Sequence, residues 1–473
     1  MERLIGRKKE TILLNKLYDS RKSEFVAIYG RRRVGKTFLV KHLFADRFAF
    51  QVTGLSKVGL KFQLNNFYKS LIRFDSRIEK ETIPESWFDA FDILIKSLER
   101  NDSEKKVIFI DELPWLDTRK SEFIPALEHF WNSWAFYRDD ILLIVCGSAT
   151  SWIINKLINN RGGLHNRVSS RIHLHSFTLK ETADFLQYKG GHYDYHQIIQ
   201  LYMAMGGIPF YLEQIDTQKS IAQNIDTLFF SESGLLRTEF ENLYNSLFSK
   251  AERHITIIRI LAEKAKGMTR KDIAQKSKLA NSGTLTRILN ELEQCGFIRK
   301  YHPFHKKNKG SIYQLVDFYS LFYLKFIENA KAFGAGAWLA QLDHPKWRAW
   351  SGYAFENICY YHLDALKKGL GIQGVYTEIS SWRANNNGAQ IDLIIDRRDR
   401  VINLCEIKFS MDEYIITKSY AENLKNKLQT FKAETKTRKS IFLTFITLYG
   451  LKQNQYAINL IQNNLRVDEV LFE

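Results

Sequence analysis

Apolar residues in the first third of the chain fall into short continuous runs that are separated by helical patterns. The strand-length runs cover residues 25–29, 107–110, 141–146 and 172–174. Between them, apolar residues recur every three or four positions, as in 36–46 and 121–134. Strands and helices that alternate at this spacing predict a parallel sheet covered by helices on both faces. The pattern therefore indicates an α/β fold class for this part of the chain.

Helical periodicity takes over near residue 178, and the pattern changes twice more along the chain. The later segments are helices at 179–188, 196–205 and 221–230, helices at 253–264, 270–276 and 282–294, strands at 296–301 and 311–315, a helix at 350–366, and strands at 373–378, 389–396 and 401–409. Three helices followed by a two-stranded hairpin across a basic turn, as in 253–315, is the order of a winged helix. The last strands predict a second α/β region.

These changes of pattern are the main guide to domain boundaries, because the chain has only 6 prolines and no Pro-, Ser- or Gln-rich linker. At roughly 150 residues per domain, a chain of 473 residues is too long for a single domain. We predict an α/β core at 1–176, a helical lid at 177–245, a winged helix at 246–318 and a further α/β domain at 319–473.

A glycine-rich loop follows the first apolar strand. Its sequence GRRRVGKT, from Gly30 to Thr37, fits the pattern G-x-x-x-x-G-K-[ST] and stands between a strand and an amphipathic helix. Gly30 and Gly35 let backbone N–H groups curve around phosphates at a helix N-terminus, where the helix dipole favours anions. Lys36 would reach the β- and γ-phosphates of ATP, and the Thr37 hydroxyl would ligate Mg²⁺. The loop predicts an ATP site.

Polar residues end two other apolar strands of this core. Asp111 and Glu112 follow 107–110, which places both carboxylates at the carboxyl edge of the sheet, where α/β proteins bind their ligands. Asp111 would hold the Mg²⁺ shell, and Glu112 would orient or deprotonate the attacking water. Ser148 follows 141–146 and has two interpretations: contact with the γ-phosphate or the water, or a cap of the next helix.

These motifs resemble the archaeal-type ATPase family, a prokaryotic branch of the AAA+-like P-loop ATPases. The resemblance rests on GRRRVGKT, on IDELPWL around Asp111, on GSATSW around Ser148 and on GGIPFYL at 206–212. It covers about residues 1–330 and implies an AAA-type sheet, a helical lid and a winged helix. By the family pattern Ser148 stands at the sensor position, and Arg167 matches the arginine after a glycine-containing loop. An arginine that acts on a phosphate in trans would require a homo-oligomer, whereas an ordinary surface arginine would not.

The net charge of +17, from 69 Lys and Arg against 52 Asp and Glu, is concentrated in the predicted winged helix. More than half of the excess lies in 250–310, and the turn at 299–310 has five cations and no carboxylate. A basic turn of this kind suits contact with the phosphate backbone of DNA. The helix at 282–294 also carries Glu291 and Glu293, which favours backbone contact over base recognition. The residues expected to contact DNA are Arg287, Arg299, Lys300, Lys306, Lys307 and Lys309.

Charged residues interrupt two apolar strands in the last region. Asp392 lies fourteen positions before Glu406, a distance that a hairpin bridges, and Glu406 and Lys408 project from the same face of one strand. Burial of such groups is costly unless they pair or bind metal. Asp392 and Glu406 can hold Mg²⁺ or Mn²⁺, and Lys408 can polarise the water or stabilise the charge that develops on the phosphate.

The spacing D-x(13)-E-x-K resembles the PD-(D/E)XK nuclease superfamily, with Ile391 in the place of the proline. In the segment GYAFE, Glu356 matches the acidic residue that the superfamily carries on a helix. Members of the archaeal-type ATPase family frequently carry such a domain after the winged helix. The resemblance implies a restriction-endonuclease-like fold in which Asp392, Glu406 and Glu356 are metal ligands and Glu406 and Lys408 take part in catalysis. The alternative is a nuclease-like domain that keeps these residues but has lost its activity, since a fold alone does not establish function.

The sequence therefore predicts an ATPase that uses ATP and Mg²⁺, contacts DNA through a winged helix and carries a metal-dependent nuclease-like domain. The alternative is an ATP-dependent regulatory switch whose winged helix docks protein and whose nuclease-like domain is inactive. No apolar run reaches the roughly 18–20 residues that span a bilayer, and the N-terminus is too charged for a signal peptide. Four cysteines lie far apart in the sequence. We expect a cytoplasmic protein without membrane contact.

Overall fold

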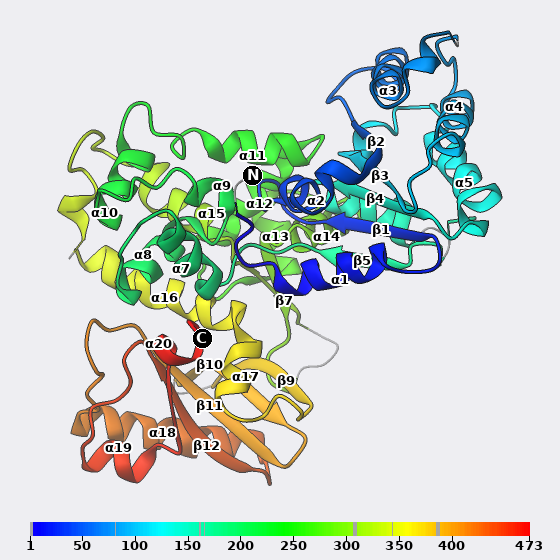
Figure 1. Ribbon diagram of the computed structural model, residues 1–473. Helices are drawn as coiled ribbons and strands as arrows, with labels where there is room; N and C mark the ends of the chain where they lie inside the picture. The colour runs from blue at the N-terminus through cyan, green and yellow to red at the C-terminus, as the bar shows by residue number, and fades with distance from the viewer. Residues whose placement is uncertain are drawn as a thin grey trace. The chain divides into compact units, whose positions relative to one another are not determined.

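The computed structural model describes residues 3–80, 82–159, 162–164, 166–305, 310–342, 344–384 and 388–473. The chain divides into two compact units, Met1–Ser176 and Phe177–Glu473 (Figure 1). None of the helices in the described ranges combines the length and the apolar character of a bilayer-crossing segment.

The first unit is built on a parallel five-stranded sheet with the strand order β2-β3-β4-β1-β5. Its strands are β1 (Glu24–Tyr29), β2 (Phe48–Thr53), β3 (Lys106–Asp111), β4 (Ile141–Gly147) and β5 (Ser170–His173). Every residue of β3 and β4 is buried, which is why these strands appear in the sequence as continuous apolar runs. The predicted α/β core with a parallel sheet is confirmed. Strand β2 was not predicted, because it lies at the sheet edge, where the half-buried Gln51 and the exposed Thr53 interrupt the apolar pattern.

Helices connect these strands, and three of them form a core against one face of the sheet. The helices are α1 (Lys8–Tyr18), α2 (Lys36–Phe44), α3 (Leu60–Phe74), α4 (Trp87–Glu99), α5 (Phe123–Ser133) and the short α6 (Thr150–Trp152). Buried aromatic residues of α3, α4 and α5 pack together and against Phe25 of β1, whose ring centre lies 4.9 Å from that of Trp131. These rings and the buried apolar residues around them form the core on this face of the sheet.

The second unit begins with a helical segment that matches the helical character predicted after residue 177. Its helices are α7 (Leu179–Tyr188), α8 (Tyr195–Met205), α9 (Pro209–Leu212), α10 (Ile221–Ile225) and α11 (Glu239–Leu247). Capping boxes at Thr178, Asp194 and Ser220 begin α7, α8 and α10, because each side chain accepts a hydrogen bond from a backbone N–H of the first turn. Local sequence therefore determines where these helices start.

Residues 251–315 form the three-helix and hairpin arrangement of a winged helix, hereafter the winged helix. Its elements are α12 (Ala251–Ala262), β6 (Met268–Thr269), α13 (Arg270–Ser277), α14 (Gly283–Gln294), β7 (Ile298–Tyr301) and β8 (Ile312–Leu315). The strands form an antiparallel sheet with the order β6-β8-β7. The predicted helices and hairpin strands coincide with these elements to within a few residues.

The last part of the second unit, hereafter the C-terminal domain, has a mixed five-stranded sheet with the order β13-β12-β11-β10-β9. Its elements are α15 (Phe318–Phe322), α16 (Pro345–Tyr361), α17 (Leu363–Gly369), β9 (Thr377–Arg383), β10 (Gln390–Arg397), β11 (Val401–Lys408), α18 (Lys418–Thr435), β12 (Ser440–Thr447), α19 (Gln455–Leu460), β13 (Asn463–Arg466) and α20 (Val467–Val470). The strands β9, β10 and β11 are antiparallel, whereas β12 and β13 run parallel to β11. Figure 1 shows α18 and α19 beside the strands of this sheet.

Two predicted boundaries in this domain were wrong. The helix expected at 350–366 is divided between α16 and α17, and the strand expected at 373–378 begins only at Thr377. Gly371, with a φ of 69°, ends α17 in a turn, and the residues before Thr377 continue that turn. The apolar residues in this segment gave a strand-like pattern without a neighbouring strand to pair with.

A buried histidine, His362, joins the helical segment to the C-terminal domain. The Leu179 N–H donates to His362 Nε2 at 3.0 Å, and Nδ1 lies 2.8 Å from the Ile358 carbonyl oxygen. Nε2 must accept while Nδ1 donates, so the ring is neutral in the fold. Burial lowers the pKa of His362 to about 4.

We therefore expect the fold to lose stability as the pH falls below 6.5, because the unfolded chain takes up a proton at His362 that the folded chain cannot accommodate. At pH 5 the loss from this residue is about 2 kcal/mol relative to pH 8. Thermal unfolding of the full chain at both pH values should show a smaller pH dependence in His362→Gln. An equal pH dependence in the two proteins would contradict this assignment.

Candidate functional site

The glycine-rich loop connects β1 to α2 in a conformation that its glycines make possible. Gly30 has a φ of 145°, and a Cβ atom at this position would lie 2.3 Å from the Leu174 carbonyl oxygen. Gly35 has a φ of 90° and precedes the first residue of α2. Both positions need glycine because of their positive φ angles, and Gly30 also needs it because a side chain would collide with Leu174.

Lys36 lies inside the curve of this loop. Its ammonium donates to the carbonyl oxygens of Gly30 and Arg31, at 3.0 Å in each case, and the residue is 6% exposed. The loop thus holds a buried positive charge at the N-terminus of α2, where the helix dipole also favours an anion. This arrangement suits the phosphates of a nucleotide.

Thr37 and Asp111 meet across the carboxyl edge of the sheet. The Thr37 hydroxyl donates to Asp111 Oδ2 at 2.8 Å, and the Glu112 N–H donates to Oδ1 at 3.0 Å. Burial raises the pKa of Asp111, and the hydrogen bond from Thr37 partly offsets that rise. A hydroxyl and a carboxylate side by side are oxygen donors of the type that Mg²⁺ prefers, so these residues fit the metal that the sequence predicts.

Glu112 and Ser148 form a second polar pair at the same edge. The Ser148 N–H and hydroxyl both donate to Glu112 Oε2, at 3.1 and 2.9 Å. The pair meets because β4 lies between β1 and β3 in the sheet, so the residue after β4 is placed between the glycine-rich loop and the acidic strand end. The capping interpretation of Ser148 is wrong, since α6 is preceded by Ala149 and the Ser148 hydroxyl is bonded to Glu112.

Arg167 lies away from the glycine-rich loop of its own sheet. It precedes β5, whose first residue, Ser170, pairs with Val26, whereas the loop follows the other end of β1. The Arg167 guanidinium stacks over the ring of Phe136, 4.4 Å from its centre. This placement argues against a role for Arg167 at its own nucleotide, and it agrees with both a role in trans and an ordinary surface arginine.

Arg7 is a polar residue of this unit that the sequence analysis did not identify. It is 4% exposed, has a φ of 57° and donates from Nη2 to the Val34 carbonyl oxygen of the glycine-rich loop at 2.9 Å. The dipeptide Gly6-Arg7 ahead of the first helix was the available signal, and one arginine in a charged N-terminus does not stand out.

In the winged helix, α14 presents the expected polar face. Thr286, Arg287 and Asn290 are exposed, and buried leucine and isoleucine residues cover the opposite face. Glu291, which was expected to repel phosphate, is bonded to His254 Nε2 at 2.8 Å and lies 3.8 Å from Arg287 Nε. Part of the unfavourable charge on this helix is therefore neutralised within the domain.

Arg299 does not lie on an open basic surface, contrary to the expectation for the turn at 299–310. Its guanidinium stacks 3.6 Å from the ring centre of Tyr360 in α16 and donates to the Gln314 side chain. Burial lowers the pKa of Arg299. Lys300 is exposed as expected. Lys306, Lys307 and Lys309 lie outside the described residues.

The sheet of the C-terminal domain brings Asp392 and Glu406 to neighbouring strands. Leu393 pairs with Cys405 in the antiparallel register of β10 and β11, so one further step sets Asp392 opposite Glu406 on the same face. The register between β10 and β9 shifts between Ile391 and Ile394, which places Asp392 at an irregularity of the kind that reorients a side chain.

Lysine side chains hold both of these carboxylates. Glu406 accepts from Lys427 Nζ at 2.6 Å and from the Tyr420 hydroxyl at 2.9 Å, and Lys408 Nζ lies 3.9 Å away. Lys427 and Tyr420 both come from α18. Glu406 is 5% exposed, so these contacts neutralise a charge that would be costly to bury alone.

Glu356 and Asp392 share a cation that comes from the winged helix. Lys266 Nζ lies 2.5 Å from Glu356 Oε2 and 2.7 Å from Asp392 Oδ1. Burial and the neighbouring Asp392 raise the pKa of Glu356 to about 7. Although burial opposes it, the Lys266 ammonium holds the pKa of Asp392 below its usual range.

The three predicted metal ligands of this domain are therefore divided between two groups. Glu356 and Asp392 meet at Lys266, whereas Glu406 is bonded to α18. Within the described ranges, no three His, Cys, Asp or Glu side chains gather as a metal centre. The physical reason is that lysines already supply the positive charge that these carboxylates need.

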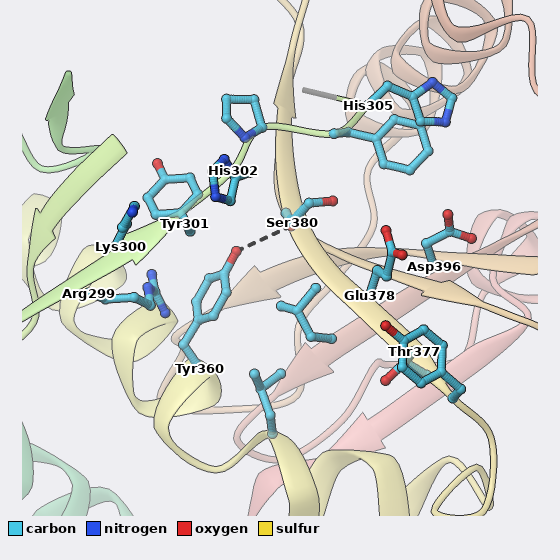
Figure 2. A pocket seen from close by; sticks show the side chains of 15 residues that line it. Arg299, Lys300, Tyr301, His302, His305, Tyr360, Thr377, Glu378, Ser380 and Asp396 are labelled. Carbon is cyan, nitrogen blue, oxygen red and sulfur yellow. Dashed lines mark hydrogen bonds between the residues drawn. The ribbon is translucent and has the colours of Figure 1, made fainter. Parts of the chain in front are cut away.

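Two hollows lie where the winged helix meets the C-terminal domain. The larger is a crevice of about 600 Å³ between β7 and β9 (Figure 2). Figure 2 shows Tyr301 and His302 on one side of Tyr360 and Glu378 on the other. A smaller cavity of about 150 Å³ is lined by Lys266, among other residues. The contact between the two domains is thus incompletely packed beside the Lys266 ion pairs.

Comparison with known proteins supports the interpretation of the glycine-rich loop. Residues 4–215 match a family described as an ATPase domain predominantly from Archaea. The match contains the whole arrangement of Lys36, Thr37, Asp111 and Glu112. The chain is an ATPase. Residues 251–301 match a family described as the IclR helix-turn-helix domain, which agrees with the observed winged helix.

Whole-chain similarities are more distant. The uncharacterized protein MJECL04 of Methanocaldococcus jannaschii is 24% identical over 416 residues, which cover 86% of this chain and 87% of that protein. The Walker-type ATPase PABY2304 of Pyrococcus abyssi is 15% identical with a TM-score of 0.49, over 68% of this chain and 96% of that chain. The ORC2 protein of Aeropyrum pernix is 15% identical with a TM-score of 0.39, over 72% of this chain and 95% of that chain.

Proposed function

We propose that this ATPase is a DNA-processing enzyme, in which ATP bound at the first unit controls DNA cleavage by the C-terminal domain. The winged helix would hold the DNA. One observation carries the proposal: Leu393 pairs with Cys405 on antiparallel strands, so Asp392 and Glu406 are the next residues of this register, and Lys408 follows two residues beyond Glu406 on the same face. Glu406 is buried, and Asp392 and Lys408 are half-buried, in an otherwise apolar sheet. Charged groups gathered in this way are characteristic of functional sites, and hydrolysis of a phosphodiester would use them.

In ATP hydrolysis, Lys36 would bind the β- and γ-phosphates in place of its two carbonyl contacts. Thr37 and Asp111 would hold Mg²⁺, which when bound neutralises charge on the phosphates. Glu112 would orient the attacking water and accept its proton, since Ser148 fixes the direction of the carboxylate through two hydrogen bonds to one oxygen.

An arginine from a second copy of the chain would complete this site. Arg167 lies at the end of the sheet opposite the glycine-rich loop, and so it would serve the nucleotide of a neighbouring molecule. This role makes the active form a homo-oligomer.

In DNA cleavage, a divalent cation would take the place of Lys266 between Glu356 and Asp392, because carboxylate oxygens are its preferred ligands. Glu406 would join these two ligands after leaving its contacts with α18. The cation when bound supplies Lewis acidity toward the phosphate and a more acidic water. Lys408 lies 3.9 Å from Glu406, where its ammonium would stabilise the charge on the phosphate oxygens. Tyr360 donates to the Asp392 carbonyl oxygen and would keep the irregular stretch of β10 in place.

The winged helix would bind DNA mainly through its phosphates. We expect Arg287→Ala and Lys300→Ala each to weaken binding of a duplex about equally for unrelated sequences. Each should lower the slope of log K against log salt by about 1, because each removes one phosphate contact. Fluorescence anisotropy of labelled duplexes over a range of salt concentrations measures this slope.

Lys425→Ala is the matched control, because it removes an exposed cation from α18 instead of the winged helix. It should leave the slope unchanged. Binding of the unmodified full chain that does not fall with rising salt would contradict the electrostatic account of DNA contact.

A second function, the ATP-dependent switch with an inactive nuclease-like domain, is favoured by the docking of the winged helix. Pro303 forms a β-bridge with Ser381, and Arg299 packs on Tyr360, so the hairpin of the winged helix binds protein within its own chain. ATP turnover with and without DNA separates the two functions. DNA-stimulated turnover supports the processing enzyme, and turnover that is indifferent to DNA supports the switch.

A further inference from the structure

Lys266 belongs to the winged helix, yet its ammonium completes the carboxylate pair of the C-terminal domain. Its Nζ atom lies 2.5 Å from Glu356 Oε2 and 2.7 Å from Asp392 Oδ1. The oxygen ligands of Mg²⁺ and Ca²⁺ stand about 2.0–2.6 Å from the ion. A divalent cation on these two carboxylates would therefore need the space that Lys266 Nζ occupies, and the two cannot be bound together.

The charge of this carboxylate pair must be offset by a cation or by a proton on Glu356. Their side chains are only 17% and 19% exposed, so two negative charges next to each other would be poorly solvated. Lys266 supplies one positive charge, whereas a metal ion would supply two. Replacement of the lysine by metal is therefore electrostatically feasible, but each bound metal must first displace the lysine.

The winged helix fixes where the Lys266 backbone lies. The residue stands in the tight turn between α12 and β6, and its carbonyl oxygen accepts from the Tyr301 hydroxyl at 2.8 Å. Gly267 follows with a φ of 79°, and a Cβ atom there would lie 2.4 Å from the Tyr313 carbonyl oxygen. The turn is thus held against the hairpin, which itself bonds to β9 where the Phe304 N–H donates to the Ser381 carbonyl oxygen at 2.9 Å.

We propose that Lys266 holds the metal position of the nuclease-like site and so keeps that site inactive while the winged helix is docked. The proposal rests on the proposed metal-dependent function of the C-terminal domain. It assigns Lys266 as an intrachain competitor of the divalent cation. Activation is then displacement of one ammonium from between these carboxylates, next to the smaller cavity that Lys266, Glu356 and Asp392 line.

The test measures Mn²⁺ binding to the nucleotide-free full chain by isothermal titration calorimetry. Lys266→Met should bind Mn²⁺ about 10-fold more tightly than the unmodified chain or better, because the competing cation is gone. Lys266→Gln, which keeps a hydrogen-bond donor without the charge, should show the same direction and guards against misfolding of the methionine variant. Lys266→Arg should bind no more tightly than the unmodified chain.

Two controls assign the effect to this position. Lys271→Met removes an exposed lysine of the same winged helix that does not line the cavity at Lys266, and it should leave Mn²⁺ affinity unchanged. Asp392→Asn combined with Lys266→Met should abolish the tighter binding. Equal Mn²⁺ affinity in the unmodified chain, Lys266→Met and Lys266→Gln would overturn the competition while leaving the metal site intact. Absence of Mn²⁺ binding in all of them would overturn both the competition and the proposed nuclease function.

Discussion

Replacement of Glu112 by glutamine should lower ATP turnover by about 10²–10⁴-fold while ATP still binds. The glutamine carbonyl can accept the two hydrogen bonds that Ser148 donates to Glu112, so the local fold is retained. The amide cannot take a proton from water, and hydrolysis loses its base. Phosphate release measures turnover, and calorimetry with a non-hydrolysable nucleotide measures binding.

Glu104→Gln makes the same chemical change in the exposed turn before β3, at the opposite end of the strand that leads to Glu112. It should leave turnover unaltered. If Glu112→Gln hydrolysed ATP as fast as the unmodified chain, the role assigned to Glu112 would be incorrect.

The second large effect is expected in DNA cleavage. Asp392→Asn and Glu406→Gln should each lower nicking of supercoiled plasmid by roughly 100-fold or more at saturating Mn²⁺, because each removes a charged ligand of the catalytic cation. Lys408→Ala should lower the rate without weakening Mn²⁺ binding, since its ammonium would contact the phosphate. Gel separation of nicked and supercoiled forms gives the rates.

Asp399→Asn provides the comparison for these variants. Asp399 lies in the turn between β10 and β11 and pairs with Arg397, so its substitution changes charge on the same hairpin away from the candidate site. Cleavage that persists unchanged in both Asp392→Asn and Glu406→Gln would remove the case for a nuclease.

The nucleotide site could be predicted in detail because its residues follow strand ends that the sequence marks clearly. The contact of Thr37 with Asp111 spans 74 residues, yet both follow buried strands of one parallel sheet, and such strands end at a common edge. The strand order was needed to place Ser148 beside Glu112. Apolar pattern alone does not reveal which strand lies between two others.

The winged helix was predictable for a different reason. Helix α14 begins at Gly283 and ends at Gln294, close to the range that its apolar periodicity predicts, because a short amphipathic helix has one buried stripe. Its surface was less predictable. Arg299 belongs to a basic turn in the sequence, but whether a cation on a strand faces solvent or a neighbouring domain depends on docking.

Lys266 shows the limit of the sequence most clearly. Its partners Glu356 and Asp392 are 90 and 126 residues away, and a lysine in a basic segment gives no signal of either. The sequence correctly predicted that a carboxylate such as Asp392, inside an apolar strand, has a positively charged partner, because an unpaired charge is costly there. The sequence predicted a metal ion as that partner. It could not show that a lysine of the winged helix takes this place.

The most direct measurement of the central claim is the rate of plasmid nicking by the purified full chain in Mn²⁺, with and without ATP. A single chain that couples its two sites should nick the plasmid at rates that differ between these conditions. In Lys36→Ala, which loses the phosphate-binding ammonium, the two rates should be equal. Nicking by the unmodified chain that is the same with and without ATP would contradict the coupling on which this account depends.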